Sequence, residues 1–276
     1  MSGPARGAAA QLRGADPPSP PSGSLLAVDG LSHSFGGLKA VSDVSFRVQA
    51  GGISALIGPN GAGKTTLFNL ISGLIRPQLG SIRLEGVELA GLPPHRIAGL
   101  GVCRTFQTTR LFPRLTALEN VMVGRHARTR AGFLSGMLNG PWTWGEERGI
   151  RRRALELLAE RGVADCASEP AGSLGFRRQR LVEIARALAA EPRLLLLDEP
   201  AAGLNLHETE ELGALIRRIR DQGITVLLVE HDMSLVMDIC DRVVVLSYGR
   251  KLAEGTPAEI QGNPEVVSIY LGGAHA

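Results

Sequence analysis

The sequence predicts an α/β fold in which helices flank a mostly parallel β-sheet. In the second half of the chain, short apolar runs of strand length alternate with segments of helical spacing, which is typical of a parallel sheet. Near the N-terminus, two strand patterns are separated only by the Gly36–Gly37 turn, which indicates an antiparallel subdomain. A stretch of helical spacing between these two parts predicts a helical insertion.

Composition supports a globular protein and excludes several classes. The chain has 276 residues, of which 44% are hydrophobic and 21% charged. Three cysteines far apart favour a reducing compartment and no zinc site. A net charge of +3 and only 4% aromatic residues argue against nucleic acid as a partner. Apolar runs are far shorter than the ~20 residues of a membrane span, so if this protein works at a membrane, another chain must hold it there.

The elements follow in order along the chain. Residues 1–24 are rich in Ala, Gly, Pro and Ser and predict a mobile tail. Two strands are expected at 25–35 and 40–48, followed by further strand and turn at 76–105. A link from Gly132 to Gly145, which contains Trp142 and Trp144, separates two helical stretches. The remaining expected strands are 53–58, 194–198, 224–230 and 242–247, and the remaining expected helices are 65–72, 176–190, 207–221 and 232–240. We therefore predict a core of 25–110 and 176–276 with a helical subdomain at 111–175.

A glycine-rich segment between a buried strand and a helix fits the phosphate-loop pattern G-x-x-x-x-G-K-[ST]. Its glycines let successive backbone N–H groups face one point, and the helix N-terminus adds partial positive charge there. We expect Lys64 to reach the β- and γ-phosphates of ATP and Thr65 to hold Mg²⁺. The predicted nucleotide-binding residues of this segment are Gly58, Pro59, Asn60, Gly61, Ala62, Gly63, Lys64, Thr65 and Thr66.

Two adjacent carboxylates end the apolar strand 194–198. Ligands bind beyond the carboxyl ends of strands in open α/β sheets. Asp198 is expected to hold Mg²⁺, and Glu199 to orient or deprotonate the water that attacks the γ-phosphate. The alternative is that both are solvated charges at a strand end with no role in catalysis, which the neighbouring phosphate loop disfavours.

Together, these motifs and His231 after another apolar strand resemble the ATP-binding cassette (ABC) ATPases, whose core is RecA-like. FGGLKAVSDVSF, RTFQTTRLF, DEPAAGLN and the closing GTPAEIQGNPEVVSIYLG are similar to LivG-type subunits of branched-chain amino acid importers. The resemblance implies that Phe35 stacks on adenine, although a core Phe in a strand turn is the alternative. It also implies that Gln107 contacts Mg²⁺ and water, that His231 contacts the γ-phosphate, and that Asn205 stands where many relatives have Asp.

One segment departs from the family. The signature that usually reads LSGGQ falls on Leu174, Gly175, Phe176, Arg177 and Arg178. In the family this segment clamps the γ-phosphate bound to the opposite subunit, and losing such donors costs on the order of 10²–10³ in rate. Arg177 or Arg178 could partly compensate, since a guanidinium suits phosphate. We therefore expect an asymmetric dimer with an intact sister ATPase of the LivF type, with a homodimer as the alternative.

The resemblance implies an ATP hydrolase that powers an importer of branched-chain or related amino acids. Its expected partners are two membrane permeases and a periplasmic or extracellular substrate-binding protein, and its expected place is the cytoplasmic face of the membrane. Two other functions stay open: an ATPase of another transporter, such as a lipopolysaccharide exporter, and a catalytically weak regulatory subunit. The basic run Arg148, Arg151, Arg152 and Arg153 is expected to be a solvated face.

Overall fold

The structure is a computed structural model that describes residues 23–125 and 141–272. The predicted tail therefore lies outside the described residues up to residue 22. The elements are β1 (Ser24–Phe35), β2 (Leu38–Gln49), β3 (Ile53–Ile57), α1 (Lys64–Ile71), β4 (Leu79–Leu84), β5 (Val87–Glu88), α2 (Pro94–Gly99), β6 (Val102–Arg104), α3 (Ala117–Arg125), α4 (Pro141–Glu160), η3 (Ala164–Cys166), η4 (Ala171–Ser173), α5 (Phe176–Ala189), β7 (Leu194–Asp198), α6 (Leu206–Asp221), β8 (Thr225–Val229), α7 (Met233–Ile239), β9 (Arg242–Ser247), β10 (Arg250–Gly255), α8 (Pro257–Gln261) and α9 (Pro264–Gly272).

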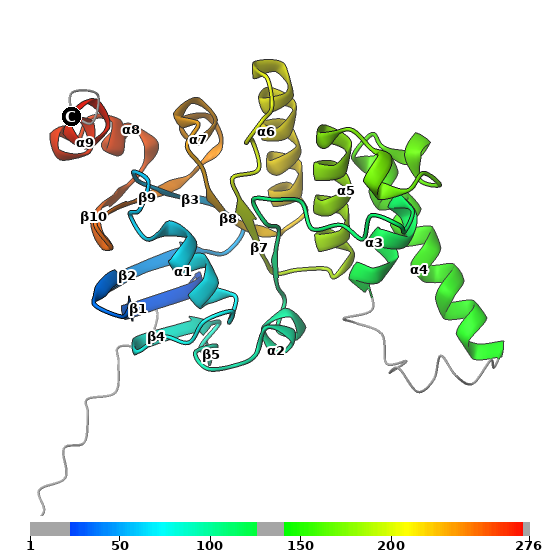
Figure 1. The fold of residues 1–276 in the computed structure, drawn as a ribbon, viewed down its shortest axis with the longest axis horizontal. Helices are drawn as coiled ribbons and strands as arrows, with labels where there is room; N and C mark the ends of the chain where they lie inside the picture. The colour runs from blue at the N-terminus through cyan, green and yellow to red at the C-terminus, as the bar shows by residue number, and fades with distance from the viewer. Residues whose placement is uncertain (1–22, 126–140, 273–276) are drawn as a thin grey trace, which may run out of the picture.

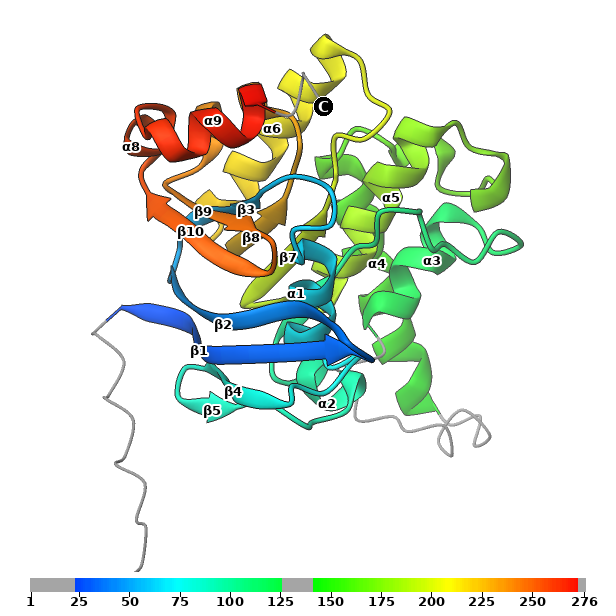
Figure 2. The same ribbon diagram turned by 60° about the vertical axis from the view of Figure 1, so that its left-hand side comes forward.

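Two sheets organise the molecule, as Figures 1 and 2 show. The central sheet has six strands in the order β10-β9-β3-β8-β7-β6. Its strands from β9 to β6 are parallel, and β10 runs antiparallel to β9. A second, antiparallel sheet has the order β2-β1-β4-β5. The predicted α/β class, with a mostly parallel sheet and an antiparallel subdomain, is confirmed.

The continuous apolar runs are strands buried on both faces. In β7, Leu194 and Leu196 join the cluster that packs α1 between the two sheets. Leu195 and Leu197 point the other way, into the cluster formed with α5, α6 and α7. Side chains alternate along a strand, so one run of leucines supplies two cores. Each fully buried leucine contributes about 1.5–3 kcal/mol of hydrophobic free energy, which fixes the strand ends that carry the polar residues.

The helices α3, α4 and α5 pack together beside the central sheet (Figure 1). Residues 141–145 of the expected link 132–145 belong to α4, which begins at Pro141 and so contains Trp142 and Trp144. The rest of that link lies outside the described part of the chain. Because α5 packs on both α3 and α4, the helical layer continues past residue 175. The boundary placed there stays a prediction.

A short helix was missed within 76–105, where only strand and turn were expected. α2 has six residues and begins with Pro94, whose fixed φ suits the first turn. Its only buried residue is Ile97, so it carries no apolar period that a sequence pattern could reveal. Over residues 23–125 and 141–272, no helix is both long and apolar enough to cross a bilayer.

Candidate active site

The phosphate loop connects β3 to α1 and is held by close backbone packing. Gly58 has φ +151°, and a Cβ there would lie 2.2 Å from the carbonyl oxygen of Leu246 in β9. Gly63 has φ +99°, and a Cβ there would lie 2.3 Å from the carbonyl oxygen of Ala40 in β2. Side chains at either position would push these strands away. The two glycines therefore fix the loop between both sheets.

Lys64 opens α1 and turns back into the loop. Its Nζ donates to the carbonyl oxygens of Gly58 at 2.7 Å and Pro59 at 3.0 Å. Burial lowers the pKa of the Lys64 amine, while the negative charges of Glu199 and Asp198 act to raise it. The N-cap residue of α1 is Gly63, so no side chain caps the first turn of this helix. The backbone N–H groups there suit an anion, as the sequence predicts.

Asp198 is buried and paired with a residue that the sequence did not single out. Its carboxylate is 5% exposed, and its Oδ2 accepts a hydrogen bond of 2.7 Å from Nη2 of Arg104, whose side chain is 6% exposed. The same guanidinium donates to Asn69 Oδ1 at 2.7 Å and to Ser72 Oγ at 3.0 Å, both from α1 or its C-terminal end. Arg104 thus joins β6, β7 and α1 beside the acidic pair.

Three predicted side chains come together at the C-terminal edge of the central sheet. Gln107 Nε2 donates to Glu199 Oε2 at 2.7 Å, and His231 Nε2 lies 3.1 Å from Glu199 Oε1. Glu199 has φ +47°, a left-handed conformation that is uncommon for a residue with a side chain. Its backbone N–H donates to the carbonyl of Val229 at 2.9 Å, so the neighbouring strand holds this turn. Residues that follow β6, β7 and β8 therefore meet at one carboxylate.

A buried ion pair on α5 anchors the loop that carries Gln107. Arg180, whose side chain is 1% exposed, donates to the carbonyl oxygens of Phe106 at 2.8 Å and Gln107 at 2.9 Å. Glu183 accepts from Arg180 at 3.2 Å and from the backbone N–H of Arg110 at 3.2 Å. Burial raises the pKa of the Glu183 carboxyl. The loop is thus tied to α5, the helix that begins at the altered signature.

Glu230 is a second buried carboxylate that sequence reasoning passed over. It is 3% exposed and lies between the end of β8 and the loop that follows β7. Oε1 accepts from the backbone N–H of Ala201 at 2.7 Å, and Oε2 accepts from that of His231 at 3.0 Å. Burial raises the pKa of the Glu230 carboxyl, whereas these N–H groups act to lower it. The sequence signal was a carboxylate directly after the apolar run at 226–229.

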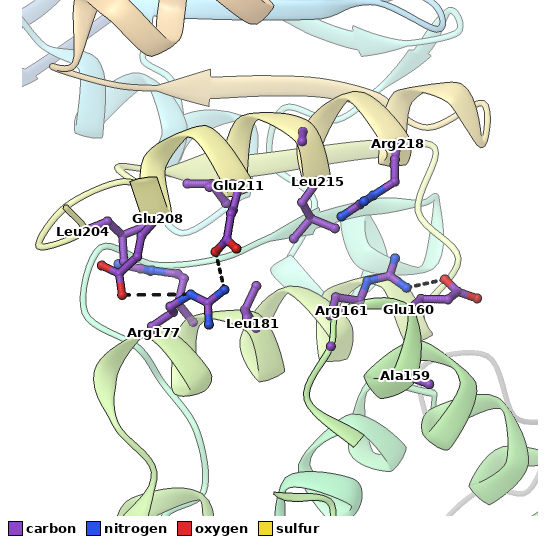
Figure 3. A pocket seen from close by; sticks show the side chains of 14 residues that line it. Ala159, Glu160, Arg161, Arg177, Leu181, Leu204, Glu208, Glu211, Leu215 and Arg218 are labelled. Carbon is purple, nitrogen blue, oxygen red and sulfur yellow. Dashed lines mark hydrogen bonds and ion pairs between the residues drawn. The ribbon is translucent and has the colours of Figure 1, made fainter. Parts of the chain in front are cut away.

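The altered signature begins α5, with Leu174 buried and Gly175 as the N-cap. Neither of its arginines is turned toward open space. Arg177 reaches across to α6, where it pairs with Glu211 and lies 4.0 Å from Glu208 (Figure 3). Arg178 pairs with Asp165 at 2.7 Å. Both guanidinium groups are paired with carboxylates of their own chain. For either arginine to bind phosphate in place of the lost signature donors, its exposed ion pair would have to break.

Phe35, Thr65 and Asn205 were also named from the sequence. Phe35 ends β1, is 50% exposed and meets the ring of His33 edge-on with centroids 4.6 Å apart. It is therefore not a core residue, which removes the alternative considered from sequence. Thr65 is exposed in the first turn of α1. Asn205 serves as the N-cap of α6, where its side chain accepts from Glu208 N at 3.0 Å.

The donor set fits Mg²⁺ held together with a nucleotide. Thr65, Gln107 and Asp198 offer hydroxyl, amide and carboxylate groups, and oxygen is the ligand that Mg²⁺ prefers. Within the described residues, no group of three or more His, Cys, Asp or Glu side chains could hold a metal by itself. Mg²⁺ is normally bound by one or two carboxylates plus substrate phosphates rather than by an all-protein cage, which agrees with a single carboxylate here.

Comparison with known proteins gives a consistent family. The family described as "ABC transporter" matches residues 41–202, and the family "Branched-chain amino acid ATP-binding cassette transporter" matches residues 250–276. The chain is 48% identical to the high-affinity branched-chain amino acid transport ATP-binding protein BraF of Pseudomonas aeruginosa, over 91% of this chain and 98% of BraF. It is 46% identical to the corresponding protein LivG of Escherichia coli, with the same coverage of both chains.

Solved structures agree with the sequence comparison. A crystal structure of the ADP conformation of an ATP-binding cassette from an ABC transporter superposes with a TM-score of 0.79 at 30% identity, covering 90% of this chain and 99% of that one. The backbone is thus that of an ATP-binding cassette, and it carries the phosphate loop and the junction of Gln107, Glu199 and His231. The chain belongs to the ABC transporter family, as one of its ATP-binding subunits.

Proposed function

We propose that this chain hydrolyses ATP to power a membrane importer of branched-chain amino acids. The observation that carries the hydrolytic part is the junction of Gln107, Glu199 and His231 next to the phosphate loop. The choice of cargo is supported by the C-terminal family match at 250–276 and by the names of relatives that share nearly half of their residues with this chain. Both supports also favour an importer over a lipopolysaccharide exporter.

In this proposal the phosphate loop and the N-terminus of α1 bind the triphosphate. The backbone N–H groups of the loop surround the β-phosphate, and the Lys64 ammonium exchanges its two carbonyl contacts for phosphate oxygens. A charge-assisted contact of this kind contributes about 1.5–3 kcal/mol. Phe35 stacks on the base, since its ring is half exposed at the end of β1. Bound Mg²⁺ would neutralise charge on the β- and γ-phosphates, with Thr65, Asp198 and Gln107 nearest to it.

The hydrolytic step needs a positioned water. In this step the Glu199 carboxylate orients the attacking water and accepts one proton from it as the water oxygen bonds to the γ-phosphorus and the bond to ADP breaks. His231 and Gln107 hold the two oxygens of that carboxylate at 3.1 and 2.7 Å, so the side chain is preoriented before substrate binds. His231 then faces the terminal phosphate as charge develops on it. Most of the rate comes from this positioning rather than from covalent chemistry.

The expected sister subunit follows from the altered signature, and the other expected partners follow from the family resemblance. Two ATP-binding subunits sandwich ATP in this proposal, with the sister subunit of the LivF type supplying an intact signature to this chain's nucleotide. Two permeases hold the pair at the cytoplasmic face of the membrane, and an external binding protein delivers the amino acid. The nucleotide facing Phe176 and Arg177 turns over slowly. Replacing the catalytic glutamate in each subunit separately tests this asymmetry, which equal losses of ATPase would contradict.

The proposed function is tested with two lysine variants of the full chain. Lys64→Ala should abolish nucleotide binding and leucine uptake by the assembled transporter. Lys251→Ala, which removes a partly exposed lysine paired with Glu254, should leave both unchanged. Glu199→Gln should keep binding but stop turnover. Binding of ATP by the parent without any turnover in the assembled complex would favour the regulatory alternative, and normal uptake by Lys64→Ala would refute the proposal.

A further inference from the structure

The Glu230 carboxylate bridges two loops at the C-terminal edge of the central sheet. One oxygen accepts from Ala201 N at 2.7 Å, and the other accepts from His231 N at 3.0 Å and from Asp232 N at 3.5 Å. The side chain is 3% exposed, so these contacts are shielded from water. A buried carboxylate that accepts backbone N–H groups at both ends holds its partners more firmly than neutral acceptors would.

Both bridged loops are fixed at their far ends. The loop after β7 ends at Asn205, whose side chain caps α6. The loop after β8 ends at Asp232, whose Oδ1 accepts from Leu235 N at 3.1 Å and caps α7. Between these fixed points, the Glu230 carboxylate determines how the backbone of His231 lies relative to Ala201.

We infer that Glu230 is a positioning residue that sets His231 against the loop 200–205, so that the histidine meets a terminal phosphate in a defined orientation. This inference rests on the proposed function and deepens it. The resemblance to the family implies that residues 201–205 of this loop, which read AAGLN, belong to the segment that crosses to the opposite ATP-binding subunit. Through Glu230, a shift of this loop at the dimer interface changes the position of His231.

The substitution Glu230→Gln separates this role from simple filling of space. Gln has nearly the same size, but one of its two terminal atoms is an –NH₂ donor. Whichever way the amide is turned, that donor faces a backbone N–H of Ala201 or of His231, and one half of the bridge is lost. Glu230→Asp keeps the charge but is one carbon too short to reach both loops.

The test measures nucleotide discrimination in the full-length chain with Mg²⁺. Dissociation constants for ADP and for a non-hydrolysable ATP analogue are compared, because only the analogue has the terminal phosphate that His231 meets. Glu230→Gln should weaken analogue binding about five- to tenfold and change ADP binding less than about twofold. Glu230→Asp should act in the same direction and serves if the glutamine variant does not fold. In the assembled complex, kcat should fall more than KM rises.

Two controls distinguish positioning from general loss of stability. Asp241→Asn alters another carboxylate that accepts a backbone N–H, that of Ile53 at 2.7 Å, at the opposite end of the sheet; it should leave the analogue-to-ADP ratio unchanged. In a His231→Ala background, Glu230→Gln should produce no further change in the ratio, because its effect passes through the histidine. A parental ratio in Glu230→Gln, or an equal effect with and without His231, overturns the inference. If the parent binds neither nucleotide, the proposed function itself fails.

Discussion

Replacing Arg104 is expected to lower the stability of the nucleotide-free chain, because its ion pair with Asp198 is buried. Replacing it with methionine keeps much of its apolar volume but leaves the Asp198 carboxylate, which is 5% exposed, without its ion-pair partner. Removing one partner of a buried pair costs about 3–5 kcal/mol. For a domain of this size, 1 kcal/mol lowers Tm by about 2–4 °C. Arg104→Met should therefore lower Tm by about 6–20 °C.

The matched control is Arg217→Met. Arg217 pairs with Asp238 at 2.6 Å, but the two side chains are 37% and 61% exposed. Exposed pairs contribute about 0–1 kcal/mol, so this variant should melt within about 4 °C of the parent. Adding Asp198→Asn to Arg104→Met should restore a large part of the loss, because a buried amide is far cheaper than a buried unpaired carboxylate.

Calorimetry of the full chain in EDTA without nucleotide measures these effects, since a bound cation could replace the guanidinium. The reasoning is refuted if Arg104→Met melts as close to the parent as Arg217→Met does. It is also refuted if the double variant is no more stable than Arg104→Met alone. Either result would mean that the Asp198 carboxylate finds water or another partner when Arg104 is gone.

Three further predictions follow from local geometry. Asn205→Ala removes the capping box of α6 and should cost about 1 kcal/mol in urea unfolding, and no loss would contradict the cap seen here. Because burial raises the pKa of Glu183, the folded chain holds its proton more tightly than the unfolded chain, and stability falls as pH rises from about 4.5 toward the raised value. Glu183→Gln should flatten this fall, and parallel curves of stability against pH would disprove the contribution. Burial also raises the pKa of the Cys240 thiol to about 12. Only about one thiol in 10⁴ is then ionised at pH 8, so iodoacetamide should modify Cys240 much faster after unfolding. Equal rates in the folded and unfolded chain, measured by peptide mass spectrometry, would argue against its burial.

Local patterns were enough to predict the framework of this fold. The apolar run at 194–198 is a strand buried on both faces, and the phosphate loop lies between β3 and α1, where the motif requires it. Gln107, Glu199 and His231 are brought together as their motifs suggested. The strand and the loop follow from a few neighbouring residues, whereas the meeting of the three side chains was expected from the family resemblance. Their roles in catalysis stay predictions.

The buried charges could not be predicted in the same way. Arg104, Arg180 and Glu230 each depend on partners far away in sequence: Asp198 for the first, the carbonyls of the Gln107 loop for the second, and Ala201 for the third. From sequence alone, a charged residue is expected to be exposed to solvent, because nothing in its neighbourhood indicates that a distant residue will pair with it in the core. The pairing of Arg177 with α6 was hidden for the same reason.

The position of β3 has a consequence for how the protein is made. This strand precedes the phosphate loop, yet it lies between β8 and β9, and Gly58 packs directly against Leu246. A nascent chain that has just completed the loop at Thr65 must wait for roughly 180 more residues, about 10–40 s of translation at ordinary speed, before its neighbours exist. Until β9 leaves the ribosome, the phosphate loop lacks the strand against which Gly58 packs. Polypeptides truncated before residue 242 should therefore be unable to retain nucleotide, however intact their glycine-rich motif.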